Sequence, residues 1–278
     1  MIAVIDDASA PEASTARDWL ANAPVANNLV LTMIAVANEF AVPFTMWVAR
    51  DDAGITGVAM QSPRDRDVVL STMAPSVAAD VARASSPTLP GVIGEAAAAA
   101  AFAGAWTERH DGCVDRLFGQ RFYELTEVRS VVLPNGTLRV ATTADLDLAV
   151  EWADAFVAET GTEPMDARRS MASSIGAQRL WMWDHGAPCA MARVAPSAAS
   201  VTRIGGVFTA PERRNRGYGS ALVAELSRRL RDRNERCVLF TQLSNATSNA
   251  IYRRIGYEAV TEVIGYSFAT AAAPRGGR

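Results

Sequence analysis

Three arginines and two glycines stand directly before an apolar helical pattern in the segment Arg213–Val223, RRNRGYGSALV. The first turn of a helix carries N–H groups without backbone partners and lies at the positive end of the helix dipole. Glycine has no side chain that would keep a ligand away from such groups. This combination is typical of an anion site, and a phosphate group suits it best. The backbone N–H groups of residues 214–220 would form the cradle.

The rest of the chain does not share this positive charge. Its formal net charge is −3 over 278 residues, which argues against a broad nucleic-acid-binding surface. All 27 basic residues are arginine, so the lysine of a phosphate-binding P-loop does not exist here. The second glycine is not followed by the third glycine of a dinucleotide-binding fold. We therefore expect a different anionic cofactor, bound locally at this loop.

Metal, secretory and membrane functions are not indicated by the sequence. Two histidines are too few for a histidine-based metal site, and His185 is expected in a solvated turn. Three cysteines, far apart and without a C-x-x-C motif, suit a reducing compartment. The N-terminus becomes acidic at Asp6, unlike a signal peptide, and the longest apolar runs are too short to cross a bilayer. We expect a cytoplasmic protein that uses no metal and binds neither nucleic acid nor membranes.

Periodicity and turn residues predict the elements that position this loop. A strand precedes it, and an amphipathic helix follows, with Leu222, Leu226 and Leu230 on one face. A short helix farther on is stopped by Gly256. From residue 138 onward the predicted order is a strand at 138–141, a helix capped by Thr143 or Asp145, a helix at 165–176, strands at 179–183, 188–194 and 200–208, a helix to about 232, a strand at 237–243, a helix at 247–255 and a strand at 257–268.

The first half of the chain repeats nearly the same order. Helices fit 11–21 and 26–40, strands fit 45–50, 54–60 and 67–71, and a helix at 76–85, a strand at 91–94, a helix at 95–110 and a strand at 113–127 follow. We interpret this as an internal structural repeat, divided at the turn Pro134–Gly136. The counterpart of the arginine–glycine loop is Ser71–Asp80, which contains neither residue type. The first half is therefore expected to be structural or substrate-shaping, without a phosphate site.

The second half resembles the GNAT superfamily of acetyl-CoA-dependent N-acetyltransferases. The family's loop pattern, Gln/Arg-x-x-Gly-x-Gly/Ala, is met by RNRGYG at residues 214–219. Behind the next strand, NATSNAIYRRIGY matches the family's Asn…Ser…Tyr…Gly-Phe/Tyr segment at Asn245, Ser248, Tyr252, Gly256 and Tyr257. The strand before the loop and the amphipathic helix after it agree with this motif. The resemblance covers the chain from residue 137, about half of it.

The whole chain also resembles the tandem type, in which a degenerate GNAT-like unit precedes an active one. This implies an α/β protein with a degenerate domain at residues 1–135 and a catalytic domain at 136–278. Each unit would contain a mixed, mostly antiparallel sheet flanked by helices. A central pair of strands would splay apart in the C-terminal unit. Acceptor specificity would lie in residues 151–176, in residues 260–268 or in the N-terminal unit.

The resemblance further implies acetyl-CoA as the co-substrate and an amine as the acceptor. The implied cofactor-binding residues are Val207, Phe208, Thr209, Arg214, Asn215, Arg216, Gly217, Tyr218, Gly219, Ser220, Asn245 and Ser248. The pantetheine arm would pair with residues 207–209 like an added strand. Asn245 would bond this arm or fix the bulge that opens the splay, and its alternative role is to cap the following helix.

Tyr252 is the implied catalytic residue. Its hydroxyl would protonate the departing thiolate after direct attack by the amine in a ternary complex. The alternative for Tyr252 is a half-buried packing residue with its hydroxyl in water. For the proton of the amine, the candidates are Glu163, Asp166, Glu151 and Asp184, and a water relay to an amine already neutral in solution is equally consistent.

The acceptor is expected to be a small molecule rather than a protein, and the protein a monomer or homodimer. Two alternative functions remain at this point. One is a small-molecule acetyltransferase similar to mycothiol synthase, which also has tandem units. The other is an acyl-CoA-binding regulatory module that has lost turnover.

Overall fold

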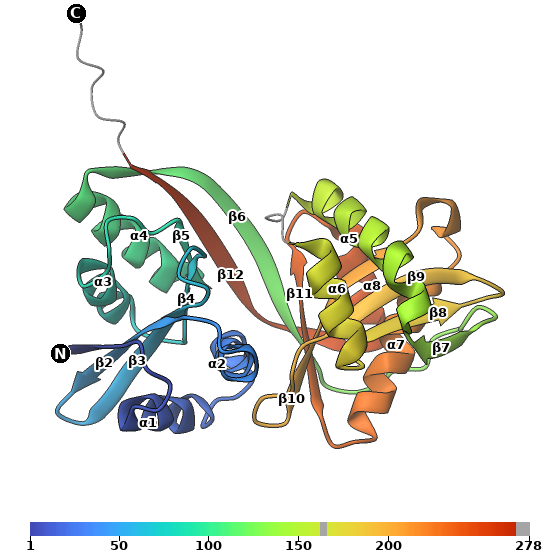
Figure 1. Ribbon diagram of the computed structural model, residues 1–278, viewed down its shortest axis with the longest axis horizontal. Helices are drawn as coiled ribbons and strands as arrows, with labels where there is room; N and C mark the ends of the chain where they lie inside the picture. The colour runs from blue at the N-terminus through green and yellow to red at the C-terminus, as the bar shows by residue number, and fades with distance from the viewer. Residues whose placement is uncertain (162–165, 271–278) are drawn as a thin grey trace, which may run out of the picture. The chain divides into compact units, whose positions relative to one another are not determined.

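The computed structural model of the chain describes residues 1–161 and 166–270. The chain divides into two compact units, coloured along the sequence in Figure 1. The first unit contains Met1–Phe122 together with the chain from Val260 onward, and the second contains Tyr123–Ala259. In the ranges described, no helix combines the length and the apolar character that crossing a bilayer requires.

The first unit is a sheet with strand order β1-β2-β3-β4-β5-β12-β6, in which β12 (Tyr257–Thr270) comes from the end of the chain; four helices flank the sheet. Its neighbouring strands pair antiparallel from β1 to β4, and β4 pairs parallel with β5. Its elements are β1 (Ile2–Ile5), α1 (Pro11–Leu20), α2 (Asn28–Phe40), β2 (Thr45–Asp51), β3 (Gly54–Gln61), β4 (Val68–Leu70), α3 (Pro75–Arg83), β5 (Gly91–Glu95), α4 (Ala96–His110) and β6 (Gly112–Leu125). The core around Trp47, Phe102 and Trp106 lies between the sheet and α3 and α4.

The second unit has strand order β6-β11-β10-β9-β8-β7. Its elements are β7 (Thr137–Val140), a 3-10 turn (Thr143–Asp145), α5 (Leu146–Thr160), α6 (Ala167–Gly176), β8 (Leu180–Asp184), β9 (Pro188–Val194), β10 (Val201–Thr209), a 3-10 turn (Pro211–Arg213), α7 (Tyr218–Arg231), β11 (Arg236–Gln242), α8 (Ala246–Ile255) and β12 (Tyr257–Thr270). One face of the sheet packs on α7 and α8, and the other packs on α5 and α6. This layering follows from apolar stripes such as Leu222, Leu226 and Leu230 on α7.

The internal repeat predicted from the sequence is present in the order of elements. Each half of the chain reads β-α-α-β-β-β-α-β-α-β. The first strand, Ile2–Ile5, was missed because it has only four residues and no alternation of buried and exposed positions. The other predicted bounds differ from the observed ones by about two residues. Met165, the predicted start of α6, and the tail 271–278 lie outside the described residues.

The predicted domain boundary at 135/136 differs from the structure. β6 and β12, each 14 residues long, run from one unit into the other. The end of β6 supplies Tyr123 and Leu125 to the core of the second unit, while β12 pairs with β5 in the first. The turn at Pro134–Gly136 therefore ends a linker within the second unit and does not separate the units.

Candidate functional site

The loop before α7 has a backbone shaped to present N–H groups. Asn215 and Gly217 have positive φ angles of 61° and 81°, in the left-handed region that glycine and asparagine tolerate. α7 begins directly afterwards, at Tyr218, and no side chain caps its N-terminus. Among the described residues, the N–H groups of this first turn therefore have no side-chain cap, and their role as a phosphate cradle stays a prediction.

Gly219 serves a second purpose that the sequence does not reveal. A Cβ atom built at this position would lie 2.8 Å from the Oγ1 atom of Thr209 at the end of β10. The glycine thus allows the first turn of α7 to pack against the end of β10. The approach of a phosphate to this turn, which stays a prediction, would need the same missing side chain.

β10 and β11 separate where β10 approaches this loop. Their parallel pairing extends from Val201 opposite Arg236 to Ile204 opposite Leu239, and β10 continues to Thr209. On the other side of β10, the register with β9 shifts between Gly205 and Phe208. This β-bulge, with Gly206 at a φ angle of 58°, turns the backbone at Val207 out of regular pairing. The predicted splay of a central strand pair is confirmed.

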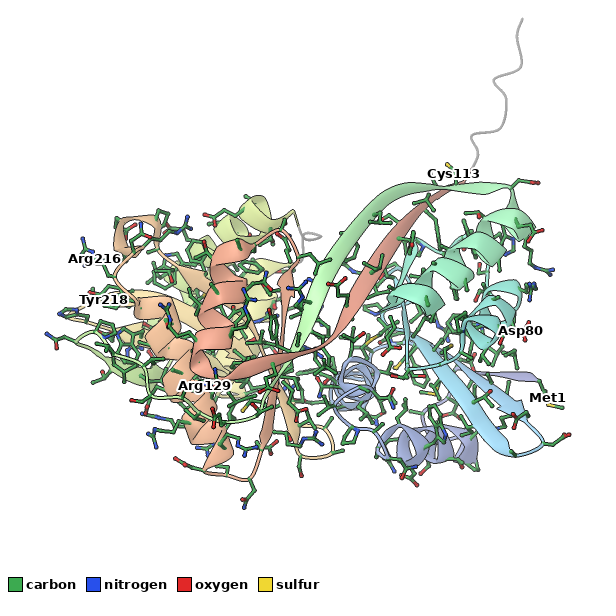
Figure 2. The ribbon with its side chains drawn as sticks, turned by 180° about the vertical axis from the view of Figure 1, so that it is seen from behind. Met1, Asp80, Cys113, Arg129, Arg216 and Tyr218 are labelled. Atoms are coloured by element: carbon green, nitrogen blue, oxygen red, sulfur yellow. The ribbon has the colours of Figure 1, made fainter. Side chains whose placement is uncertain are left out.

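A cleft of about 600 Å³ lies at this splay, within the second unit. Every predicted site residue except Arg216 lines it: Val207, Phe208, Thr209, Arg214, Asn215, Gly217, Tyr218, Gly219, Ser220, Asn245, Ser248 and Tyr252. Arg216 is exposed, and Figure 2 shows it at the outer edge of the loop. The end of α5 adds Phe156, Glu159 and Thr160, which the sequence analysis did not identify.

Arg214 is held by protein groups across one wall of the cleft. Its Nη2 lies 2.6 Å from the Oε1 of Glu159, and its Nε donates to the carbonyl oxygen of Thr209 at 3.0 Å. The guanidinium also lies 5.5 Å from the centre of the Phe208 ring. Arg214 therefore orders the cleft wall. No local pattern predicts its pairing with Glu159, because the two residues are 55 positions apart.

Tyr252 lies on α8, lines the cleft and is only 7% exposed. Its ring meets Tyr123 and Tyr257 edge to face, at 6.4 Å and 6.0 Å between ring centres. Burial raises the pKa of Tyr252 to about 12, and a hydrogen bond with the side chain of Ser248 opposes this shift. The ring is buried and not half-buried, and the choice between a proton donor and a packing residue stays open. Tyr252 is a packed core residue that also borders the cleft.

Two asparagines at the start of α8, Asn245 and Asn249, have different structural roles. The Oδ1 atom of Asn245 accepts a hydrogen bond from the backbone N–H of Ser248 at 2.9 Å, so Asn245 caps α8. Asn249 is buried, and its Nδ2 donates to the carbonyl oxygens of Gln242 and Asn245 at 3.0 Å and 2.7 Å. Asn249, which the sequence analysis did not identify, thus fixes the turn from β11 to α8. The role of Asn245 toward a pantetheine arm stays a prediction.

The described candidates for a general base do not line the cleft. Asp184 pairs with Arg139, at 3.0 Å between its Oδ2 and the Nε. Asp166 accepts a hydrogen bond from the backbone N–H of Arg169 and caps α6. Glu151 is exposed on α5, and Glu163 lies outside the described residues. Among the described residues, Glu159 is the carboxylate that lines the cleft, and it is paired with Arg214.

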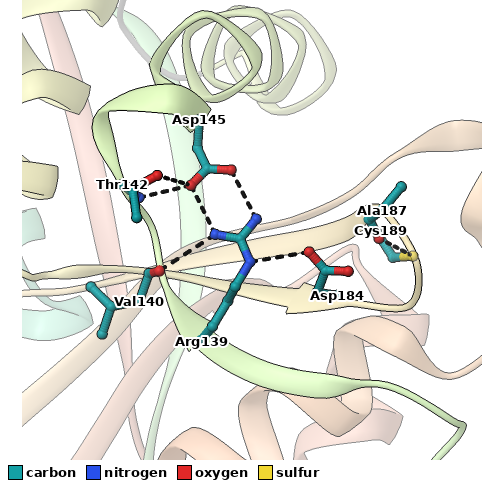
Figure 3. Close-up of polar contacts among 7 residues, drawn as sticks. All are labelled: Arg139, Val140, Thr142, Asp145, Asp184, Ala187 and Cys189. Atoms are coloured by element: carbon teal, nitrogen blue, oxygen red, sulfur yellow. Dashed lines mark hydrogen bonds and ion pairs between the residues drawn. The ribbon is translucent and has the colours of Figure 1, made fainter.

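A polar network fixes the start of α5 to the edge of the sheet (Figure 3). Arg139 on β7 donates to both carboxylate oxygens of Asp145 at 2.8 Å, and its Nε donates to Asp184 on β8. Asp145 also accepts from the backbone N–H of Thr142 at 2.7 Å. Of the two expected caps, Thr143 and Asp145, Asp145 holds the N-cap position of α5; its carboxylate bonds Arg139 and closes a capping box with Thr142 at the preceding 3-10 turn. The pKa of Asp145 is lowered to about 2, mainly by the hydrogen bonds from Arg139.

His185 lies in the turn between β8 and β9 and is exposed, as expected. It is not isolated, because its Nδ1 lies 2.8 Å from the hydroxyl of Tyr218 at the start of α7. The turn therefore contacts the first residue of the helix whose N-terminus borders the cleft.

Comparisons with known proteins agree with this geometry. Residues 189–264 match the family model described as FR47-like protein. A search of curated protein sequences gives no match. A GNAT-family acetyltransferase from Colwellia psychrerythraea is similar in structure, with a TM-score of 0.60 and 11% identity over 97% of this chain and 100% of that one.

Two further solved structures are similar over nearly their whole length. A Drosophila protein has a TM-score of 0.68 and 14% identity, with 96% of this chain and 98% of that one covered. A tandem GNAT protein from the clavulanic acid biosynthesis pathway has a TM-score of 0.54 and 13% identity, with 98% and 99% covered. At these identities the likeness establishes the fold. The fold that the resemblance implied is confirmed, and the chain has the fold of the GNAT acetyltransferases in its tandem form.

Proposed function

We propose that this protein is an acyl-CoA-dependent N-acyltransferase that transfers an acetyl group from acetyl-CoA to an amine. The observation that carries the proposal is the cleft at the splay of β10 and β11, where the uncapped start of α7 and Tyr252 lie on the same cavity. An anion cradle and a buried hydroxyl on the wall of one cleft would suit a long cofactor with phosphate at one end and a thioester at the other.

The backbone would hold the cofactor. The pyrophosphate would accept hydrogen bonds from the N–H groups of residues 214–220, which lie at the positive end of α7. The pantetheine arm would pair with Val207–Thr209, where β10 has left β11. The bulge at Gly206 would direct an N–H group near Val207 toward the thioester oxygen, as in an oxyanion hole.

The amine nitrogen would attack the thioester carbonyl carbon while both substrates are bound. A C–N bond forms, the C–S bond breaks, and the thiolate takes the proton of the Tyr252 hydroxyl. Because burial keeps the pKa of Tyr252 near 12, the phenol stays protonated at neutral pH and is available as a donor. The proton lost by the amine would restore the phenol by way of water.

We infer that the amine reacts in its neutral form and that no carboxylate removes its proton. Among the described residues, the cleft's own carboxylate is paired with Arg214, and the other described candidates lie elsewhere. The amine would then lose its proton to water, and its neutral fraction would be the form that reacts. Water would thus take the place of the three described candidates, Asp166, Glu151 and Asp184, while Glu163 lies outside the described residues.

The first unit would support the second without binding the cofactor. Its segment Ser71–Asp80 has neither arginine nor glycine, and α3 begins there with Pro75 at its N-terminus. Proline supplies no N–H group for a phosphate. We propose that the first unit is degenerate and that the second unit is specific for acetyl-CoA.

The test is to incubate the full chain with acetyl-CoA and a panel of amines, and to measure free thiol. We expect acetyl-CoA binding by calorimetry and thiol release that depends on the amine. Binding without thiol release from any amine would identify an acyl-CoA-binding module instead. Absence of acetyl-CoA binding by a folded protein would refute the proposal altogether.

A further inference from the structure

The first unit contains a cavity of about 180 Å³ between the helices α1 and α2 and one face of its sheet. Its floor includes Met46 on β2 and Met60 on β3, which are buried and lie directly opposite each other. Successive strand residues point to opposite faces, so this methionine pair lies on the face away from Trp47, which packs with α3 and α4. Every residue that lines the cavity belongs to the first unit, and the cavity is therefore separate from the cleft of the second.

The second unit has a large side chain at the corresponding place. Met182 on β8 and Met191 on β9 also lie directly opposite each other, and these strands follow two helices, as β2 and β3 do. Trp152 of α5 is buried in the same core cluster as this second methionine pair. In the first unit, α1 takes the place of α5 and presents Ala13 to the cavity, while α2 presents Ala37. Small side chains thus leave a space where the second unit has an indole ring.

The inner part of this cavity is apolar and has the size of one ring. Phe44, Met46 and Met60 line it and are all buried. Protein interiors are normally close-packed, and an unfilled space beside buried side chains lowers stability. A cavity of roughly 150 Å³ holds one benzene ring. The polarizable side chain of methionine packs well against aromatic rings. The cavity therefore suits a ligand with a single aromatic ring.

The outer part of the lining is polar and positively charged. Ser14 and Arg17 of α1 and Asn38 of α2 line the cavity and are exposed. The Nη2 of Arg17 donates to the hydroxyl of Ser14 at 3.2 Å. Its Nε lies 3.7 Å from the Oδ1 of Asp18, but the side chain of Asp18 is 74% exposed, so water screens this pair. Among the described residues that line the cavity, Arg17 has a charged side chain and no residue has a carboxylate.

We propose that the first unit binds a small aromatic carboxylate in this cavity, with the ring on Met46 and Met60 and the carboxylate on Arg17. The planar fork of N–H donors on arginine matches the two oxygens of a carboxylate, and the amide of Asn38 can donate a further hydrogen bond. An apolar pocket with a few polar groups that fix the orientation is typical of small-molecule sites. The site lies outside the cleft and does not depend on the proposed function.

The first experiment follows benzoate binding to the full chain labelled with ¹³C at its methionine methyl groups. The ring current of a bound ring should shift the resonances of Met46 and Met60, assigned by single Met→Leu variants, and the titration gives Kd. Met182 and Met191, buried in the second unit, are the internal control and should not shift. We expect a Kd for benzoate on the order of 1 mM or below. Benzamide has the same ring without the charge and should bind on the order of 10-fold more weakly.

The second experiment repeats the titrations with variants. Arg17→Gln should raise the Kd for benzoate roughly 10-fold and leave the Kd for benzamide unchanged. The matched control is Arg83→Gln, because Arg83 on α3 is an exposed arginine of the same unit paired with Asp80, and both Kd values should stay unchanged. Ala37→Leu fills the cavity from α2 and Ala13→Leu fills it from α1, so each should abolish the binding of both compounds.

Circular dichroism identifies the variants that are folded. Because Arg17 is exposed, Arg17→Gln keeps the test available if a leucine variant does not fold. Unchanged resonances of Met46 and Met60 in benzoate would overturn the site. Equal Kd values for benzoate and benzamide, full benzoate affinity in Arg17→Gln, or full affinity in a folded leucine variant would overturn it as well.

Discussion

Three tyrosine rings meet beside the cleft, and their hydroxyl groups have different partners. Tyr123 donates to the Oδ1 of Asn249 at 2.8 Å, and the hydroxyl of Tyr257 lies 2.8 Å from that of Ser227. Tyr252 is the member of this cluster that lines the cleft. Its chemistry would therefore depend on position rather than on residue type.

Tyr252→Phe should slow turnover without weakening acetyl-CoA binding. The phenyl ring keeps its contacts with Tyr123 and Tyr257, so only the proton donor is lost. We expect kcat to fall on the order of 10²-fold, measured where chemistry limits the rate. Tyr257→Phe is the matched control, which should cost about 1 kcal/mol of stability through its lost hydrogen bond and leave kcat unchanged. Equal kcat values for Tyr252→Phe and wild type would reduce Tyr252 to a packing residue.

The pH profile should follow the acceptor and not Tyr252. A donor with a raised pKa stays active below that pKa and is lost only as the pH rises through about 12. An amine that must be neutral gains reactivity as the pH rises toward its own pKa. We expect kcat/KM to increase about tenfold per pH unit from pH 7 until the pH reaches the pKa of the amine. The pH at which this rise ends should change with the pKa of the amine that is used. A limb at one fixed pH for amines of different pKa would point to a general base on the protein.

Gly219→Val should weaken acetyl-CoA binding by ~2 kcal/mol or more, because the branched side chain occupies the approach of the pyrophosphate. It should also lower stability, since its Cβ would crowd the Oγ1 of Thr209 at 2.8 Å. Adding Thr209→Ala removes that crowding and should restore stability but not binding. Calorimetry that shows full affinity in the folded Gly219→Val variant would contradict the phosphate cradle.

The sequence predicted the residues of this site whose roles are local. The loop Arg214–Ser220 and the cap Asn245 are readable because glycine, asparagine and a following apolar pattern stand next to one another. Glu159 and Asn249 could not be found this way. Glu159 reaches the site through a partner distant in the chain, and Asn249 looks like any polar residue of a short helix until Tyr123 is placed beside it.

At the scale of elements, α5 is oriented by the network of Arg139, Asp145 and Asp184. The C-terminal end of this helix brings Phe156, Glu159 and Thr160 to the cleft. The network holds the opposite end of α5 and thereby helps to position these residues. The sequence predicted a polar start for α5. It could not show that Asp145 bonds a neighbouring strand, because the position of β7 beside β8 is set by tertiary packing.

Asp145→Ala should destabilise the fold by about 2 kcal/mol, because it removes a paired carboxylate from Arg139 and a partner from Thr142. Since the pKa of Asp145 is lowered to about 2, its contribution is present above its ordinary pKa and is lost as the pH falls from about 4 to 2. Denaturation at pH 7 and at pH 2 should therefore show a difference between variant and wild type that shrinks with acid. Asp147→Ala, which removes an exposed partner of Arg168, is the control and should change little. A difference independent of pH would contradict the pairing.

At the scale of the whole molecule, the two repeats share one order of elements but differ in the loop that precedes their third helix. Their element order follows from hydrophobic periodicity, which is why the sequence predicted it. The course of β6 and β12 could not be predicted, since periodicity shows that a strand exists and not which strand it pairs with. In each unit the strand beside the parallel pair comes from the other half of the chain: β12 beside β5, and β6 beside β11. Tyr123 reaches the tyrosine cluster in this way.

A crystal structure of the full chain with excess acetyl-CoA tests the central claim most directly. We expect one acetyl-CoA per chain, with its pyrophosphate on the N–H groups of residues 214–220 and its sulfur near the Tyr252 hydroxyl. The first unit should hold none, because its counterpart segment has no glycine and no arginine. Density for the cofactor near Ser71–Asp80, or at any place other than the cleft between β10 and β11, would contradict the assignment of the site.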